Sequence, residues 1–295
     1  MKLKKSGMVL IYKPSGITSF KSLSYIKKAL GHGKVGHAGT LDKFAEGLLI
    51  VAAGTCTRLI SVFESLPKIY EGTICFGKTT STLDPEGEVV RESCIPSLKM
   101  IEEVVPGFIG EIMQVPPLFS AIHVNGQRAY KRALKGEQVE LKARKVRIYS
   151  IDILDWTKPY LTLKISCSKG TYIRSLARDI GEACGSAAFL SGLKRSSIGE
   201  FSSSEAVAPE SFDTERDLLS PGQFLKKVSS VRILTVPNDR IAGIRNGVQF
   251  TPDWVENDFS ESIAALFTKE GFFLALVENC DNTWKYRMVT EGDAG

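Results

Sequence analysis

The chain has 295 residues, of which 43% are hydrophobic and 24% charged, and its formal net charge is +5. This composition is ordinary for a soluble globular protein with one large and one small domain. Unbroken apolar runs such as Leu48 to Ala53 are far shorter than the roughly 20 residues that cross a bilayer, and no secretory signal pattern follows the basic N-terminus. We therefore expect a cytoplasmic protein that does not enter membranes.

Six cysteines are scattered without a CxxC pair, which predicts reduced thiols and neither disulfides nor a zinc site. The three histidines lack the spacing of metal ligands, no GxGxxG pattern follows a predicted strand, and no GxSxG pattern occurs. We expect no metal and no other cofactor.

In chain order, the first predicted element is a helix. Thr18 or Ser19 is placed to cap its N-terminus, and Gly31 is placed to end it. Apolar residues recur between them at helical spacing: Phe20, Leu23, Ile26 and Leu30.

Residues 68–76 alternate in polarity and predict a strand. Gly72–Thr79 also fits the phosphate-loop pattern GxxxxGK[ST], whose mechanism needs a flexible loop followed by a helix. Here the loop positions continue the strand, and the next residues contain Pro85 and Gly87 without helical spacing. We interpret the match as a coincidence.

Residues 161–168 alternate more regularly and predict a second strand, and Thr171 is placed to open a helix that ends before Gly185. Strands and helices without a regular alternation predict an α+β domain with a mixed, mainly antiparallel sheet flanked by helices. Residues 202–228 form a predicted connector. Short strands at 233–236, 263–267 and 272–277 then predict a small β-rich module. The expected domains are residues 8–230 and 231–292.

Between Arg128 and Arg147 the chain has eight cations and two acids, an excess larger than the net charge of the whole chain. A localised basic segment favours a polyanionic partner, because each phosphate contact releases counterions. A solvated surface loop is the alternative interpretation of this segment.

Asp42 follows three closely spaced glycines and precedes an apolar run. A carboxylate beside such a run is poorly solvated and needs a cation to stay ionised. Arg174 is a candidate for that cation, because it lies near the start of a predicted helix, where a positive charge opposes the helix dipole. From spacing alone, Asp42 could equally be a loop cap.

The segment Gly36–Leu49 resembles the catalytic loop of the TruB family of tRNA pseudouridine synthases, whose pattern is GHTGTLDPxAxGLL. Four further blocks resemble family motifs in the same order. These blocks are Tyr12–Ser19, Lys68–Gly87, Gln114–Ala121 and Ser166–Arg174. The resemblance covers roughly residues 10–200 and implies the pseudouridine synthase fold.

By this resemblance, Asp42 is the nucleophile that breaks the N1–C1′ bond of a uridine, position 55 in the T-loop of tRNA. Tyr70 stacks on the base and is a candidate for moving the C5 proton. Arg174 pairs with Asp42 and keeps it ionised. The isomerisation needs no cofactor, so the missing cofactor motifs are consistent with it.

Further roles implied by the resemblance concern RNA contact. Tyr172 and Leu193 line the uracil pocket, and His37 helps to hold the target nucleotide flipped out. A thumb-like insertion at about residues 117–144 clamps the T-arm, and residues 231–292 resemble a PUA domain. The cations expected to contact RNA are Arg128, Lys131, Arg132, Lys135 and Arg144. A monomer that requires no protein partner is expected.

The sequence departs from the family pattern at three places. Lys43 replaces a proline, Ala38 replaces a threonine, and Ser81 stands where an aspartate is frequent, which would remove a charge that orients Arg174. Two alternatives stay open: a non-catalytic tRNA-binding or tRNA-folding protein with the same fold, and a glycoside hydrolase or nucleosidase. The latter chemistry normally needs two carboxylates, and Glu46 and Asp84 are the nearby candidates for the second.

Overall fold

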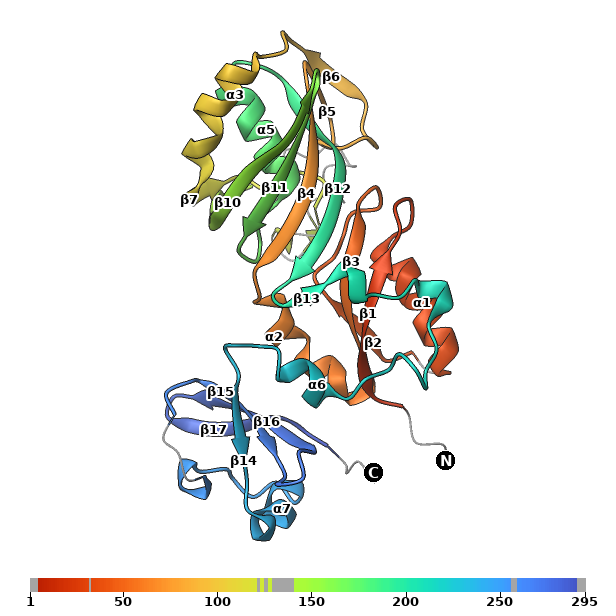
Figure 1. Ribbon diagram of the computed structural model, residues 1–295, viewed down its shortest axis with the longest axis vertical. Coiled ribbons are helices and arrows are strands. Elements are labelled where there is room, and N and C mark those ends of the chain that lie inside the picture. The colour runs from red at the N-terminus through yellow and green to blue at the C-terminus, as the bar shows by residue number, and fades with distance from the viewer. Residues whose placement is uncertain are drawn as a thin grey trace.

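The computed structural model describes residues 5–31, 33–120, 123–124, 127–128, 141–255 and 259–290, with backbone alone for 123–124 and 127–128. In these residues the main feature is a nine-stranded sheet (Figure 1). Its strand order is β1 (Gly7–Lys13), β3 (Glu46–Ala53), β12 (Ala188–Ile198), β4 (Lys68–Phe76), β11 (Tyr160–Cys167), β10 (Arg144–Thr157) and β7 (Gly110–Gln114). Two short strands lie off this path: β2 (Val35–Ala38) pairs with β3, and β13 (Phe201–Ser202) pairs with β12.

The sheet is antiparallel except where β12 runs parallel to β3 over two residue pairs, Lys194 with Glu46 and Arg195 with Gly47. This short contact joins a small half, with β1, β2 and β3, to a larger half with β12, β4, β11, β10 and β7. The mixed, mainly antiparallel sheet predicted from the sequence is therefore confirmed.

The predicted first helix is confirmed as α1 (Ser19–Leu30). The Thr18 hydroxyl caps its N-terminus by accepting a hydrogen bond from the Lys21 amide, and Gly31 ends it with a left-handed φ of 68°. The second predicted helix is α5 (Ile173–Ala183). It begins two residues later than Thr171, because the Thr171 hydroxyl donates to the Ser168 carbonyl and closes the preceding turn instead.

The predicted strands at 68–76 and 161–168 are confirmed as β4 and β11. The segment that resembled a phosphate loop continues from β4 into β5 (Lys78–Thr80), which pairs with β6 (Val89–Glu92), so no helix receives a phosphate there. The remaining elements of this region are η1 (Gly54–Leu59), α2 (Ile60–Glu64), α3 (Leu98–Val104), η2 (Val105–Phe108), β8 (His123–Val124) and β9 (Gln127–Arg128).

The C-terminal part forms a four-stranded sheet that lies below α2 and α6 in Figure 1. Its strands are β14 (Arg232–Thr235), β15 (Ile263–Phe267), β16 (Phe273–Cys280) and β17 (Thr283–Val289). The connector contributes η3 (Ser203–Glu205), η4 (Pro209–Ser211) and α6 (Pro221–Leu225), and α7 (Asn238–Arg245) and η5 (Pro252–Trp254) follow β14. Neither β17 nor α7 was predicted from the sequence.

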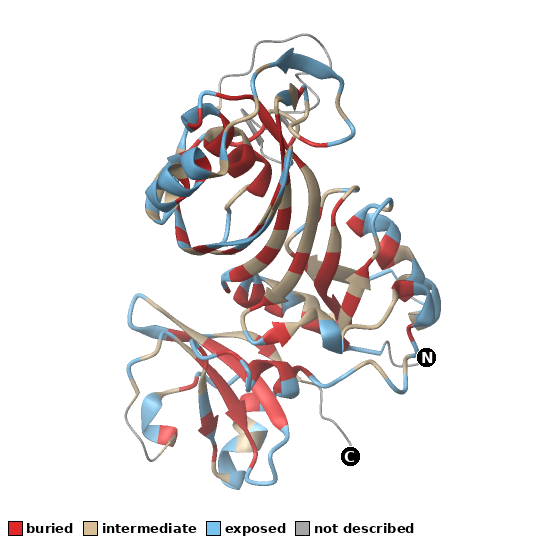
Figure 2. Cartoon of the chain, turned by 45° about the horizontal axis from the view of Figure 1, so that its top comes forward, coloured by how far each residue is buried: buried red, intermediate tan, exposed pale blue. Residues whose placement is uncertain are grey.

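One hydrophobic cluster spans the two sheets. It combines Phe63 of α2 and Phe224 of α6 with Phe267 and Phe273 of the C-terminal sheet. The Phe267 ring packs against Gly222, where an added Cβ would lie 2.8 Å from the ring. Buried residues accordingly line the junction between the two parts (Figure 2). Burial of aromatic surface thus holds the C-terminal sheet against the larger one.

We expect Phe267→Ala to lower the free energy of unfolding by about 3–5 kcal/mol, because it empties a packed aromatic site between the two sheets. Phe272→Ala is the matched control, since Phe272 is 47% exposed whereas Phe267 is 3% exposed. Urea unfolding followed by circular dichroism measures both. Equal effects of the two substitutions would contradict the shared core.

Candidate active site

The loop that carries Asp42 connects β2 to β3, and buried polar side chains bind its backbone. The Ser19 hydroxyl makes hydrogen bonds with the backbone amide and carbonyl of Leu41, both at 3.0 Å. The Lys13 ammonium group donates to the carbonyl of Ala45 at 2.6 Å and of Lys43 at 3.3 Å. Burial lowers the pKa of Lys13 to about 8. These contacts fix the loop backbone on both sides of Asp42.

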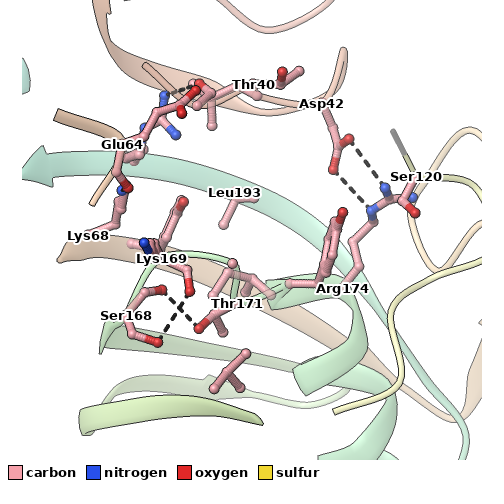
Figure 3. A pocket seen from close by; sticks show the side chains of 18 of the residues that line it. Thr40, Asp42, Glu64, Lys68, Ser120, Ser168, Lys169, Thr171, Arg174 and Leu193 are labelled. Carbon is pink, nitrogen blue, oxygen red and sulfur yellow. Dashed lines mark hydrogen bonds and ion pairs between the residues drawn. The ribbon is translucent and has the colours of Figure 1, made fainter. Parts of the chain in front are cut away.

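Arg174 projects from the first turn of α5 and meets the Asp42 carboxylate (Figure 3). Arg174 Nε lies 3.0 Å from Asp42 Oδ2, and Nη2 donates to Oδ1 at 3.3 Å. The Nε contact is an ion pair rather than a well-aligned hydrogen bond. The Arg174 side chain is 4% exposed and that of Asp42 38%, so the carboxylate faces the solvent side of the pair. The anionic partner that the position of Arg174 predicted is therefore present.

A second carboxylate, Asp84, holds Arg174 from the other side. Asp84 Oδ2 lies 2.9 Å from Arg174 Nη1, and Asp84 Oδ1 accepts hydrogen bonds from the Thr82 hydroxyl and the Glu86 amide. The carbonyls of Thr82 and Phe119 accept two further hydrogen bonds from the guanidinium. Ser81 was expected to remove a charge that helps to orient Arg174, and the structure shows that Asp84 supplies such a charge.

The environment of Asp42 favours its neutral form more than water does. Burial raises the pKa of Asp42, the nearby charges of Asp84 and Glu86 raise it further, and the Arg174 guanidinium opposes the rise. Lys43, which replaces the proline of the family pattern, forms an exposed ion pair with Glu86 at 3.1 Å. Such a surface pair contributes little to stability.

A cleft of about 580 Å³ opens above the Asp42–Arg174 pair. It brings together five of the residues predicted for the site: Asp42, Tyr70, Tyr172, Arg174 and Leu193. The Gln114 side chain makes two hydrogen bonds with the backbone of Tyr172. Its Oε1 accepts from the Tyr172 N–H at 2.8 Å, and its Nε2 donates to the Tyr172 carbonyl at 3.1 Å. Burial raises the pKa of the Tyr70 hydroxyl.

Of the other predicted residues, Arg144 also lines the cleft, and the rest lie elsewhere or outside the described residues. His37 lies on β2 outside the cleft lining, and burial together with the charge of Arg195 lowers its pKa to about 4, so its ring is neutral. Arg144 lines the cleft, where its guanidinium stacks on the Tyr172 ring at 4.5 Å. Arg128 is described only as backbone in β9, and Lys131, Arg132 and Lys135 lie outside the described residues.

Two cleft residues were not predicted to act there. Lys68 of β4 donates to the Glu64 and Leu66 carbonyls, and burial lowers its pKa to about 8. Arg195 of β12 is 1% exposed. Lys68 opens β4, and Arg195 follows Lys194 in β12, so neither position carried a distinct signal in the sequence. Among the described residues, no three His, Cys, Asp or Glu side chains converge as a metal site requires, and no helix is long and apolar enough to cross a bilayer.

Comparisons with known proteins identify the family. Residues 27–173 match the N-terminal domain of the TruB family of pseudouridylate synthases. The chain is 40% identical to tRNA pseudouridine synthase B of Borreliella burgdorferi over 97% of this chain and 99% of that protein. It is 36% identical to the protein of the same name from Clostridium kluyveri, over 96% and 98% of the two chains.

Among solved structures, the chain is similar to one from a Cbf5-Nop10-Gar1 complex, with a TM-score of 0.72 and 22% identity over 96% of this chain and 85% of that one. The fold is the α+β pseudouridine synthase fold with an added C-terminal sheet. The chain belongs to the TruB family of pseudouridylate synthases.

We expect Asp84→Asn to change the pH dependence of pseudouridine formation. Because the pKa of Asp42 is raised, the rate of the native protein should fall as the pH drops through a value above that of an ordinary aspartate. Removing the Asp84 charge lowers the pKa of Asp42, so this acid limb should move to lower pH. The rate at neutral pH should fall about 10- to 100-fold, because Arg174 loses an anchor.

Single-turnover rates measured across pH test this prediction. Asp179→Asn is the control, because Asp179 pairs with Arg178 on the same helix at 2.7 Å but lies outside the cleft. An unshifted acid limb with an unchanged rate in Asp84→Asn would show that Asp84 does not act on the pair.

Proposed function

We propose that this chain is a tRNA pseudouridine synthase that converts the uridine at position 55 of the T-loop to pseudouridine, with Asp42 as its nucleophile. The observation that carries the proposal is the Asp42 carboxylate, fixed by Arg174 in the wall of a cleft that also contains Tyr70. The names of the relatives, which are tRNA pseudouridine synthases, support tRNA as the substrate.

In the proposed reaction, Asp42 assists cleavage of the N1–C1′ bond, and the freed uracil rotates and joins C1′ through C5. The C5 proton is lost, and N1 gains a proton, so the change has no net redox or hydrolytic step and no cofactor is needed. Arg174 keeps Asp42 ionised and aimed. The half-exposed position of the carboxylate supports attack on a sugar that enters from the cleft.

Tyr70 is proposed to stack on the base and to move the C5 proton, and its place in the cleft with Leu193 and Tyr172 supports this role. The glycosidic bond of a uridine stacked inside a folded loop is not accessible to an enzyme side chain, so we propose that the nucleotide is flipped out. His37 would help to hold it there. The neutral ring of His37 suits stacking between bases better than an ionic contact.

The hydrolase alternative needs a second carboxylate across the scissile bond. Asp84 is 4% exposed and committed to Arg174, Thr82 and Glu86, so it is not free to act as a general acid. This commitment removes Asp84, one of the two candidate acids, from the hydrolase alternative.

For RNA binding, we propose that the basic insertion at about residues 117–144 clamps the T-arm, with Arg144 at its base beside Tyr172. Residues 8–230 would form the catalytic domain, and residues 231–292 a PUA-like module. A hollow lined by Arg245 and Asn246 of this module is proposed as an additional RNA contact. The protein is proposed to act as a monomer in the cytoplasm.

Asp42→Asn should abolish release of tritium from C5-labelled uridine in tRNA while leaving tRNA affinity within about twofold, because the variant removes the attacking charge and conserves the shape of the side chain. Loss of a nucleophile typically costs several orders of magnitude in rate. Asp155→Asn is the control, since Asp155 is an exposed acid on β10.

Other outcomes of this assay identify the alternatives. Tritium release at the native rate by Asp42→Asn would refute the catalytic role of Asp42. Free uracil would indicate the hydrolase. Tight tRNA binding by the native protein without any pseudouridine would indicate the tRNA-folding protein.

A paired substitution of Lys145 and Arg147 by glutamine should weaken tRNA binding and reduce the slope of log affinity against log salt by roughly 1–2 units, because each lost phosphate contact releases one counterion fewer. The control pair is Lys99→Gln with Lys158→Gln, two exposed lysines away from the cleft. Identical salt slopes for both pairs would remove Lys145 and Arg147 from the RNA contact.

A further inference from the structure

Arg195 is a buried cation without an acidic partner. It is 1% exposed, and no ion pair joins it to a carboxylate in the part of the chain that the structure describes. An unpaired charge in a protein interior is costly, so a neutral side chain would serve stability better at this position. The charge of Arg195 therefore calls for an explanation beyond packing.

The guanidinium grips both ends of the loop that carries Asp42. Arg195 Nη2 donates to the carbonyl of Gly39 at 3.0 Å, and Nε donates to the carbonyl of Leu48 at 2.8 Å. Lys13 and Ser19 hold the same loop at Ala45 and Leu41. Arg195 joins the first residue after β2 to a residue inside β3, across the base of the loop.

Arg195 also lies where the two halves of the sheet join. Its backbone pairs with Gly47 of β3 on one side and with Tyr70 of β4 on the other, and β12 runs between these strands in Figure 1. Gly47 has a φ of 110°, and a Cβ added there would lie 2.3 Å from the Arg195 carbonyl oxygen. Only glycine allows this close approach. Arg195 is therefore shared by the strand that follows Asp42 and the strand that carries Tyr70.

The backbones of Arg195 and Tyr70 are paired, and the Arg195 charge acts on the Tyr70 hydroxyl. Cys167 of β11 and Asp42 are further titratable groups that act on that hydroxyl. A guanidinium has donors only, so a hydrogen bond from it to the phenol oxygen leaves the hydroxyl proton to point elsewhere. Burial raises the pKa of Tyr70, and Arg195 opposes that rise.

We propose that Arg195 is a positioning residue for pseudouridine formation: it fixes the Asp42 loop against Tyr70 and turns the Tyr70 hydroxyl proton toward the bound base. This inference rests on the proposed roles of Asp42 and Tyr70. Asp42 and Tyr70 come from different halves of the sheet, and in this proposal the Arg195 side chain keeps their relative position constant.

The test compares Arg195→Met, which removes the charge, with Arg195→Lys, which keeps it. Three quantities are measured: the single-turnover rate, the RNA dissociation constant, and the titration of 3-fluorotyrosine placed at position 70, which is followed by ¹⁹F NMR without RNA. Arg195→Met should slow the rate about 100-fold with little change in RNA affinity, and should raise the pKa of the fluorotyrosine. Arg195→Lys should restore the titration but only part of the rate, because an ammonium group does not reproduce the two-armed grip.

Lys13→Met is the matched control. It removes a buried cation that holds the same loop, but its donors go to backbone carbonyls away from Tyr70. It should slow the rate and leave the titration at position 70 in place. Circular dichroism verifies that each variant is folded. If Arg195→Met does not fold, the results for Arg195→Lys decide the question.

An Arg195→Met rate within about threefold of the native rate, an unchanged titration at position 70, or a loss confined to RNA affinity would each overturn the proposal. Its failure is distinct from failure of the proposed function. If the native protein makes no pseudouridine, the function fails, whereas the ¹⁹F titration still decides whether Arg195 acts on Tyr70.

Discussion

The site depends on one buried guanidinium held between two carboxylates. Arg174 stands in the first turn of α5, where the helix dipole and burial both disfavour a positive charge. It is stable there because Asp42, Asp84 and two backbone carbonyls together meet its donors. The dependence is mutual, since Asp42 would be harder to ionise without it. Removing either acid would leave the buried guanidinium without one of its carboxylate partners. This costs more stability than replacing the whole ion-pair network with neutral side chains.

The partners in this network come from distant parts of the chain: the loop after β2, the turn after β5, the segment after β7, and α5. Their convergence therefore requires the whole sheet. Gln114 illustrates how this is achieved, because it ends β7 and clasps the backbone of Tyr172, directly before α5. Buried polar side chains that hold backbone groups thus place the reacting groups, while apolar packing supplies most of the stability.

Local patterns predicted the elements that carry the site, and the charge at an unfavourable helix position predicted an anionic partner for Arg174. The role of Asp84 was not predicted: the sequence pointed to Asp84 only as a candidate second carboxylate, and its contact with Arg174 depends on how the turn after β5 folds against α5. Arg195 gave no distinct signal, because it follows another cation, Lys194, and precedes two serines. Strand β17 does alternate in polarity, with Trp284 and Tyr286 separated by Lys285, so its signal was present but was not used, whereas α7 lacks an apolar stripe.

The C-terminal sheet is placed by the same physical effect that builds the larger sheet. Domains joined by a linker usually meet through small polar surfaces and move relative to one another. Here Phe267 and Phe273 enter a cluster with Phe63, which lies on α2. Helix α2 follows η1, and η1 follows β3, the strand that begins after the loop that carries Asp42. Arg287 of β17 adds a hydrogen bond to the Ser61 hydroxyl on α2 at 2.9 Å. The C-terminal sheet therefore keeps a fixed position relative to Asp42. An RNA that contacts both the C-terminal sheet and the cleft is bound by the two surfaces together rather than independently.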